Sequence, residues 1–155
     1  MVSDCLCLVD AHVAIDGFKH CYFGALVGCN SIGISGWTST EVRFYETEDG
    51  ATVPIDLTSY VQTGAIRIEH ANVIELQALA TSSLTRRLGL GELESLALVV
   101  GRGFFFCTAD QPAVRAMKEL GVHDHWIHLF DICPSAQQLL PVSEVHKYTR
   151  SAVQF

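Results

Sequence analysis

Two acidic residues end predicted strands, and a third begins a predicted helix. Asp10 ends the apolar run of residues 5–10, Asp110 follows the apolar run of residues 104–107, and Glu92 opens a helix-forming stretch. Short apolar runs are typical of strands buried on both faces of a parallel sheet. Because open α/β sheets bind ligands beyond the carboxyl ends of their strands, we expect Asp10 and Asp110 to meet there. Glu92 begins the helix that leads into the second strand, so it can reach the same edge.

Carboxylates brought together in this way favour a divalent metal ion. They repel and raise one another's pKa unless a cation joins them. Mg²⁺ and Mn²⁺ prefer oxygen ligands, so a site built from acids alone indicates phosphoryl chemistry. One or two such ions would activate a water molecule to hydrolyse a phosphodiester, and the protein would supply no covalent nucleophile. Each acid also has a structural interpretation, since Asp caps helices and Glu suits a first helical turn.

The elements that must hold these acids alternate between strands and helices. Connections are predicted at the Gly- and Ser-rich residues 24–36 and at residues 48–50. Alternation of this kind predicts a parallel α/β sheet with right-handed crossovers. We expect a single domain over residues 1–155, because no linker or internal repeat is visible. Strands are predicted at residues 5–10, 65–68, 104–107 and 126–130, and helices at residues 11–18, 40–46, 71–88, 92–100, 112–120 and 134–140.

The composition indicates a cytoplasmic globular protein. Hydrophobic residues make up 49% and charged residues 17% of the 155 positions. No apolar run approaches the roughly 20 residues that span a bilayer, and the N-terminus lacks the cationic region of a signal peptide. The six cysteines include no C-x-x-C pair, and His123, His125 and His128 have no cysteine pair at the spacing of a zinc site. We therefore expect reduced cysteines, with Cys5, Cys7 and Cys107 buried as small hydrophobic residues.

Charge and motifs narrow the classes of function further. The formal net charge of −7 disfavours broad electrostatic adhesion to nucleic acid. Part of that charge would be cancelled if several carboxylates bound a divalent ion. No G-x-G-x-x-G loop, Walker motif or G-x-S-x-G elbow is present, so nucleotide-binding loops and serine-hydrolase triads are not expected.

The sequence resembles the PIN-domain family, and within it the VapC-like proteins. The resemblance rests on residues 8–11, on the "GE-x-E" helix within residues 88–98, on the "T-x-D" ending at residues 108–110, and on residues 113–116. It implies a three-layer α/β/α fold around a central, mostly parallel sheet of about five strands. It also implies an endoribonuclease dependent on Mg²⁺ or Mn²⁺, often a toxin neutralised by a protein antitoxin, and commonly a homodimer.

The resemblance assigns roles to the acids. Asp10, Glu92 and Asp110 match the first, third and fourth acidic motifs of the family and are the expected metal ligands. The second acid is a Glu on an early helix, for which Glu41 is the nearest match and Glu46 the alternative.

Five further residues are assigned secondary roles. Thr108 is expected to hydrogen-bond a carboxylate or a metal-bound water. Glu94 lies about 200° around the helix from Glu92, so only one of the two can face the site squarely, and Glu92 is preferred. Arg43, Arg102 and Arg115 are the candidate phosphate contacts.

One departure from the family pattern leaves other functions open. Many relatives carry further acids beside the last motif, where this chain has Ala109 and Gln111, and basic residues near the site are few. A PIN-like protein-interaction module with little or no turnover is therefore an alternative to the ribonuclease. A metal-dependent phosphatase that acts on small phosphoesters is a third hypothesis, because it would use the same acids.

Overall fold

A parallel sheet forms the centre of the molecule. The computed structural model describes residues 5–80, 83 and 87–153. The strands of this sheet are β1 (Cys7–Val9), β2 (Ile32–Ser35), β5 (Ile66–Glu69), β6 (Phe105–Cys107) and β7 (Trp126–Ile127). Their order is β5-β2-β1-β6-β7, and every neighbouring pair is parallel. The five-stranded parallel sheet expected from the sequence is confirmed.

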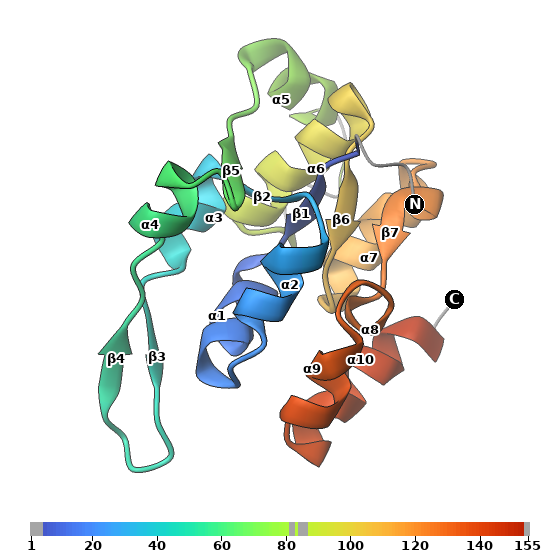
Figure 1. The fold of residues 1–155 in the computed structure, drawn as a ribbon. Helices are drawn as coiled ribbons and strands as arrows, with labels where there is room; N and C mark the ends of the chain where they lie inside the picture. Colours follow the sequence, from blue (N-terminus) through green and yellow to red (C-terminus); the bar gives the residue numbers. More distant parts are fainter. Residues whose placement is uncertain (1–4, 81–82, 84–86, 154–155) are drawn as a thin grey trace.

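Helices cover both faces of this sheet, as Figure 1 shows. On one side lie α1 (Ala11–Lys19), α2 (Phe23–Cys29), α8 (Leu129–Ile132), α9 (Pro134–Leu139) and α10 (Val142–Val153). On the other lie α5 (Val73–Ala80), α6 (Leu90–Arg102) and α7 (Gln111–Glu119). The described part of the chain also contains α3 (Gly36–Glu41), α4 (Thr58–Gln62) and a 3₁₀ turn at His123–His125.

The central strand shows why its sequence is apolar throughout. Cys7 and Val9 of β1 pack into the core beside α1 and α2, whereas Leu6 and Leu8 pack into the core beside α6 and α7. Successive side chains of a strand point to opposite faces, so a strand covered on both sides needs apolar residues at every position. The alternation confirms the three-layer α/β/α architecture.

The Gly- and Ser-rich residues 24–36, predicted as a connection, instead form most of α2, all of β2 and the start of α3. Gly33 explains the error. A Cβ atom on Gly33 would lie 2.6 Å from Leu6 Cδ2, so glycine here permits two buried strands to pack closely. Glycine was a sign of tight packing and not of a loop.

Residues 40–46 are not one helix. Ser35 begins α3, its Oγ accepting the Thr38 N–H at 3.2 Å, and the helix ends at Glu41. Residues 44–46 are strand β3 (Phe44–Glu46), which pairs antiparallel with β4 (Thr52–Pro54) across the expected turn at residues 48–50. This hairpin projects from the body of the protein in Figure 1.

Two other predictions need correction at their ends. The strand predicted at residues 126–130 stops at Ile127, because His128 Nδ1 accepts the Phe130 N–H at 3.1 Å and begins α8. The helix predicted at 71–88 is α5 over Val73–Ala80, and residues 81, 82 and 84–86 lie outside the described part. No helix within the described ranges is long and apolar enough to cross a membrane.

Candidate active site

Asp10 lies directly beyond the carboxyl end of β1 and is 5% exposed. One carboxylate oxygen accepts the Val13 N–H at 2.8 Å and caps α1, and the other accepts the hydroxyl of Thr108. Burial raises the pKa of Asp10, although both hydrogen bonds oppose that rise. The fold therefore holds an acid in a position where its charge is poorly solvated.

Asp110 lies beyond the end of the neighbouring strand, β6, and caps α7. Its Oδ2 accepts the Ala113 N–H at 3.1 Å. The backbone N–H of Asp110 donates to Thr108 Oγ1 at 3.1 Å, and the same hydroxyl donates to Asp10. The buried Thr108 thus links the two acids, which lie close together because β1 and β6 are parallel neighbours that end at the same edge of the sheet. Both acids are helix caps and also face a common cavity.

Glu92 approaches from a different element, the first turn of α6. Burial, followed by repulsion from Asp110 and Asp10, raises the pKa of Glu92 to about 8. A helix N-terminus favours a negative charge, so the neighbouring carboxylates and the burial outweigh the helix dipole here. Near neutral pH this side chain needs either a proton or a nearby cation.

Glu41, the last residue of α3, is brought beside Glu92 by close packing of α3 on α6. A Cβ atom on Gly91 would lie 2.6 Å from Thr38 Oγ1 and 3.1 Å from Glu41 Oε1, so no larger residue fits there without a shift. Glu46 is on the projecting hairpin and is not among the residues that line the cavity. The geometry favours Glu41 over Glu46 as the second acid.

These side chains surround a cavity of about 680 Å³ at the carboxyl edge of the sheet. His12 of α1 and Lys147 of α10 also line it. All the acids preferred from the sequence are therefore on its wall: Asp10, Glu41, Glu92 and Asp110.

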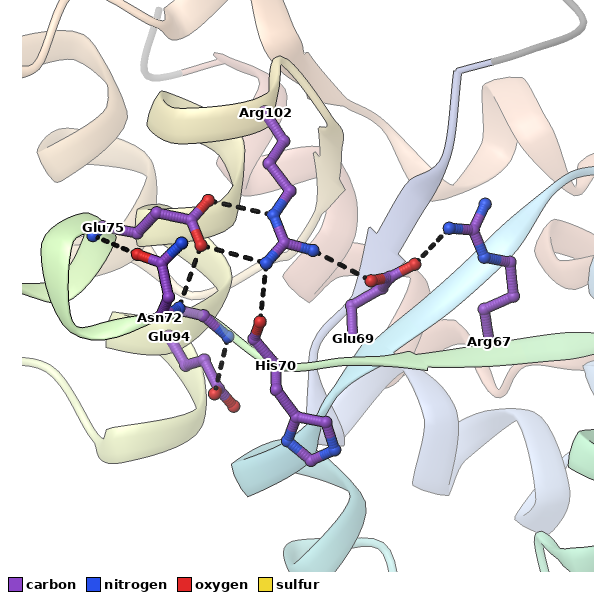
Figure 2. A network of polar contacts seen from close by, with 8 residues as sticks. Arg67, Glu69, His70, Asn72, Glu75, Glu94 and Arg102 are labelled. Carbon is purple, nitrogen blue, oxygen red and sulfur yellow. Dashed lines mark hydrogen bonds and ion pairs between the residues drawn. The ribbon is translucent and has the colours of Figure 1, made fainter.

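Glu94 faces away from this cavity. It is 4% exposed, and its Oε1 and Oε2 accept the backbone N–H groups of Trp37 at 2.8 Å and Ala71 at 3.1 Å. Glu94 therefore joins α6 to the start of α3 and to the segment before α5, part of which is drawn in Figure 2. Its contribution to the site is to fix neighbouring elements, and it does not line the cavity.

None of the three candidate arginines lines the cavity. Arg102 donates from Nε to Glu75 Oε2 at 2.9 Å and from Nη1 to Glu69 Oε2 at 3.0 Å, in the network of Figure 2. It lies ten residues from Glu92 on α6, about 15 Å along the helix. Arg43 and Arg115 are exposed elsewhere. The expectation for Arg102 is corrected, because the acids around it already occupy its guanidinium.

A second group of side chains could hold a metal ion. His12, Asp16 and Glu144 offer ligand atoms that all lie within 4.8 Å of one another, a spacing that Asp10, Glu92 and Asp110 do not reach. His12 Nε2 is 3.3 Å from Asp16 Oδ2, whose carboxylate also accepts the Tyr148 hydroxyl at 3.1 Å. Glu144 is already paired with Lys147, at 2.9 Å from both oxygens. A metal ion here would compete with that ammonium group.

Sequence reasoning missed His12, Lys147 and this second group. His12 carried a signal, because it follows Asp10 by two positions at the start of a predicted helix. Lys147 carried none that was specific, because no element had been assigned beyond Leu140 and the packing of α10 depends on residues far away in the sequence.

Comparison with solved structures finds a PilT N-terminus (PIN) domain protein from the hyperthermophilic archaeon Sulfolobus solfataricus. The match covers 88% of this chain and 97% of the other, with a TM-score of 0.50 and 13% sequence identity. The chain has the PIN fold. No protein-family model and no curated protein matches the sequence. At this identity the likeness concerns the fold, and the PIN fold places Asp10 and Asp110 at the carboxyl edge of the sheet.

Proposed function

We propose that this protein is a divalent-metal-dependent endoribonuclease. The observation that carries the proposal is the convergence of four acids from four segments on one cavity at the sheet edge. The PIN fold is consistent with a nuclease. The resemblance of the sequence motifs to VapC-like proteins implies RNA as the substrate class.

The donor set fits Mg²⁺ or Mn²⁺. Every carboxylate of the cavity offers oxygen, which hard divalent ions prefer. Asp10 is buried with a raised pKa, and the pKa of Glu92 reaches about 8, so both would gain from a cation. The alternative group of His12, Asp16 and Glu144 fits less well, because one of its three ligands is an imidazole nitrogen and hard divalent ions prefer oxygen. We therefore propose Asp10, Glu92 and Asp110 as the ligands, with Glu41 beside them.

Different residues of the cavity have different roles in the proposed reaction. A bound divalent ion would activate water for in-line attack on the phosphodiester and offset charge on the phosphate oxygens. Thr108 holds the Asp10 carboxylate and the Asp110 backbone in one arrangement, so the ligands are fixed before the ion arrives. Glu41, exposed at the cavity wall, is placed to accept a proton from the attacking water.

Partners follow from the same resemblance. We propose that the protein forms a homodimer and, if it acts as a toxin, binds a protein antitoxin. Exposed Val73 and Ile74 on α5, 68% and 77% accessible, are apolar positions available for such contacts. Light scattering of the purified protein would test the dimer directly.

Asp110→Asn tests the activity. Asn also caps helices, so the variant should keep α7 while losing a charged ligand. Cleavage of RNA in Mn²⁺ should fall at least about a hundredfold, because several kcal/mol of transition-state stabilisation are removed. Asp56→Asn is the matched control, since Asp56 accepts the Thr58 N–H at 2.9 Å outside the cavity. It should cleave at the wild-type rate.

Other outcomes select the alternatives. Equal cleavage by Asp110→Asn and wild type would refute the assignment of the site. Failure of the wild type to cleave RNA in either metal would favour the interaction module, which the scarcity of arginine and lysine around the cavity supports. Hydrolysis of nucleotides without cleavage of RNA would favour the phosphatase.

A further inference from the structure

Helix α10 brings a cation to the wall of the acidic cavity. Among the described residues that line this cavity, Lys147 is the one lysine or arginine. The other named cavity residues include four carboxylates, which would repel the phosphates of an approaching RNA strand. Lys147 is therefore the side chain best placed to attract a phosphate to this site.

The position of Lys147 is fixed by its neighbour. Tyr148 is 2% exposed, its hydroxyl donates to Asp16 Oδ2 at 3.1 Å, and its carbonyl accepts from His128 Nε2 at 3.0 Å. These contacts attach α10 to α1 and to the cap of α8. Because Tyr148 is anchored in the core, Lys147 leaves the helix next to the cavity.

The Lys147 ammonium is held and yet accessible. Its Nζ lies 2.9 Å from both carboxylate oxygens of Glu144, one helical turn earlier. The Lys147 side chain is 54% exposed and that of Glu144 is 23% exposed. Because the Lys147 side chain is half exposed, water screens its pairing with Glu144, and an incoming phosphate can replace Glu144 as the partner of the ammonium.

We propose that Lys147 is a substrate-binding residue that pairs with a backbone phosphate of the RNA strand, with α10 forming one wall of the substrate site. This inference rests on the proposed ribonuclease function and deepens it. Glu144 holds the ammonium in place in the free protein and competes with the phosphate for it.

Breaking the Lys147–Glu144 pair from each side distinguishes binding from a structural role. Lys147→Gln should weaken the binding of a short fluorescein-labelled single-stranded RNA about threefold to fivefold at low salt, and reduce the salt slope of log K by about 1. Glu144→Gln removes a competing negative charge and should strengthen binding. Fluorescence anisotropy measures the affinity of both variants for RNA. EDTA in the buffer prevents cleavage and keeps metal ions away from His12, Asp16 and Glu144. A purely structural pair would give both variants the same sign of effect.

Two more variants complete the test. Lys147→Arg should bind RNA as the wild type does, because the cation is retained. Lys118→Gln, an exposed lysine on α7 outside the cavity, should leave affinity nearly unchanged. Affinity that falls in both Lys147→Gln and Glu144→Gln, or that Lys118→Gln lowers equally, overturns the proposal.

The cleavage reaction separates this proposal from the function on which it rests. In Mn²⁺, Lys147→Gln should raise KM and leave kcat close to wild type, whereas Asp110→Asn should lose kcat. If the wild type bound RNA through Lys147 without cleaving it, the ribonuclease function would be refuted and the role of Lys147 in binding would stand. If the wild type cleaved RNA and the Lys147→Gln variant had the same KM, the role of Lys147 in binding would be refuted and the ribonuclease function would stand.

Discussion

The Glu92 side chain carries an electrostatic cost in the candidate site. Its ordinary pKa of 4.5 is raised to about 8 by burial and by the charges of Asp110 and Asp10. A carboxyl group whose pKa is raised on folding favours the folded protein in its protonated form. Its contribution to stability is fully present below pH 4.5 and is lost as the pH rises through about 8.

Glu92→Gln should remove this dependence on pH. Without divalent metal, the free energy of unfolding of the wild type should fall relative to the variant between pH 5 and pH 8. Because Glu92 is only half buried, solvent screening limits the difference to the order of 1 kcal/mol. Urea denaturation at both pH values in EDTA measures it, with Glu48→Gln on the exposed hairpin as control. Parallel pH profiles for wild type and Glu92→Gln would contradict the raised pKa.

The two glutamates of helix α6, Glu92 and Glu94, have different roles. Glu92 lines the cavity, while Glu94, two positions later, accepts backbone N–H groups from Trp37 and Ala71. The helical angle of about 200° between them predicted that only one could face the site. The sequence did not show which glutamate faces the cavity or what the other one binds, because both depend on the packing of α3 and α5 against α6.

Glu94→Ala should destabilise the protein by about 2–3 kcal/mol, because two part-buried backbone donors lose a charged acceptor. Glu94→Gln keeps one amide oxygen as an acceptor and should cost roughly half as much. Urea denaturation at pH 7 compares the two with Glu41→Ala, which removes an exposed carboxylate and should change stability by less than about 0.5 kcal/mol. A loss from Glu94→Ala no larger than that from Glu41→Ala would rule out this role.

Elements that depend on local signals were predictable, and those that depend on distant contacts were not. The apolar runs before Asp10 and Asp110 revealed two central strands, because strands covered on both faces need continuous apolar sequence. Strand β2 was not predicted, because Gly33 resembles a loop residue in the sequence, whereas in the structure it allows close packing against Leu6. Helix α10 was missed for a similar reason, since Tyr148 is fixed by Asp16, far away in the chain.

At the scale of the whole molecule, the order of the strands creates the site. The central strand β1 pairs with β2 on one side and β6 on the other, and both Asp10 and Asp110 follow strands of this group. Helices α3 and α6 then add Glu41 and Glu92, and α10 adds Lys147. The β3–β4 hairpin follows Glu41 and projects outward from the same region (Figure 1). Asp10 and Asp110 were predictable as strand ends, whereas the position of the Lys147 cation depended on the complete fold.

The location of bound Mn²⁺ tests the central claim most directly. Crystals of the full chain soaked in MnCl₂ and measured by anomalous diffraction should show a peak coordinated by Asp10, Asp110 and Glu92, because these carboxylates relieve their mutual repulsion by binding a cation. The competing group offers an imidazole nitrogen beside two carboxylates, whereas the site of Asp10, Asp110 and Glu92 offers oxygen alone, which hard ions prefer. A peak at His12, Asp16 and Glu144, with none between Asp10 and Asp110, would contradict the account.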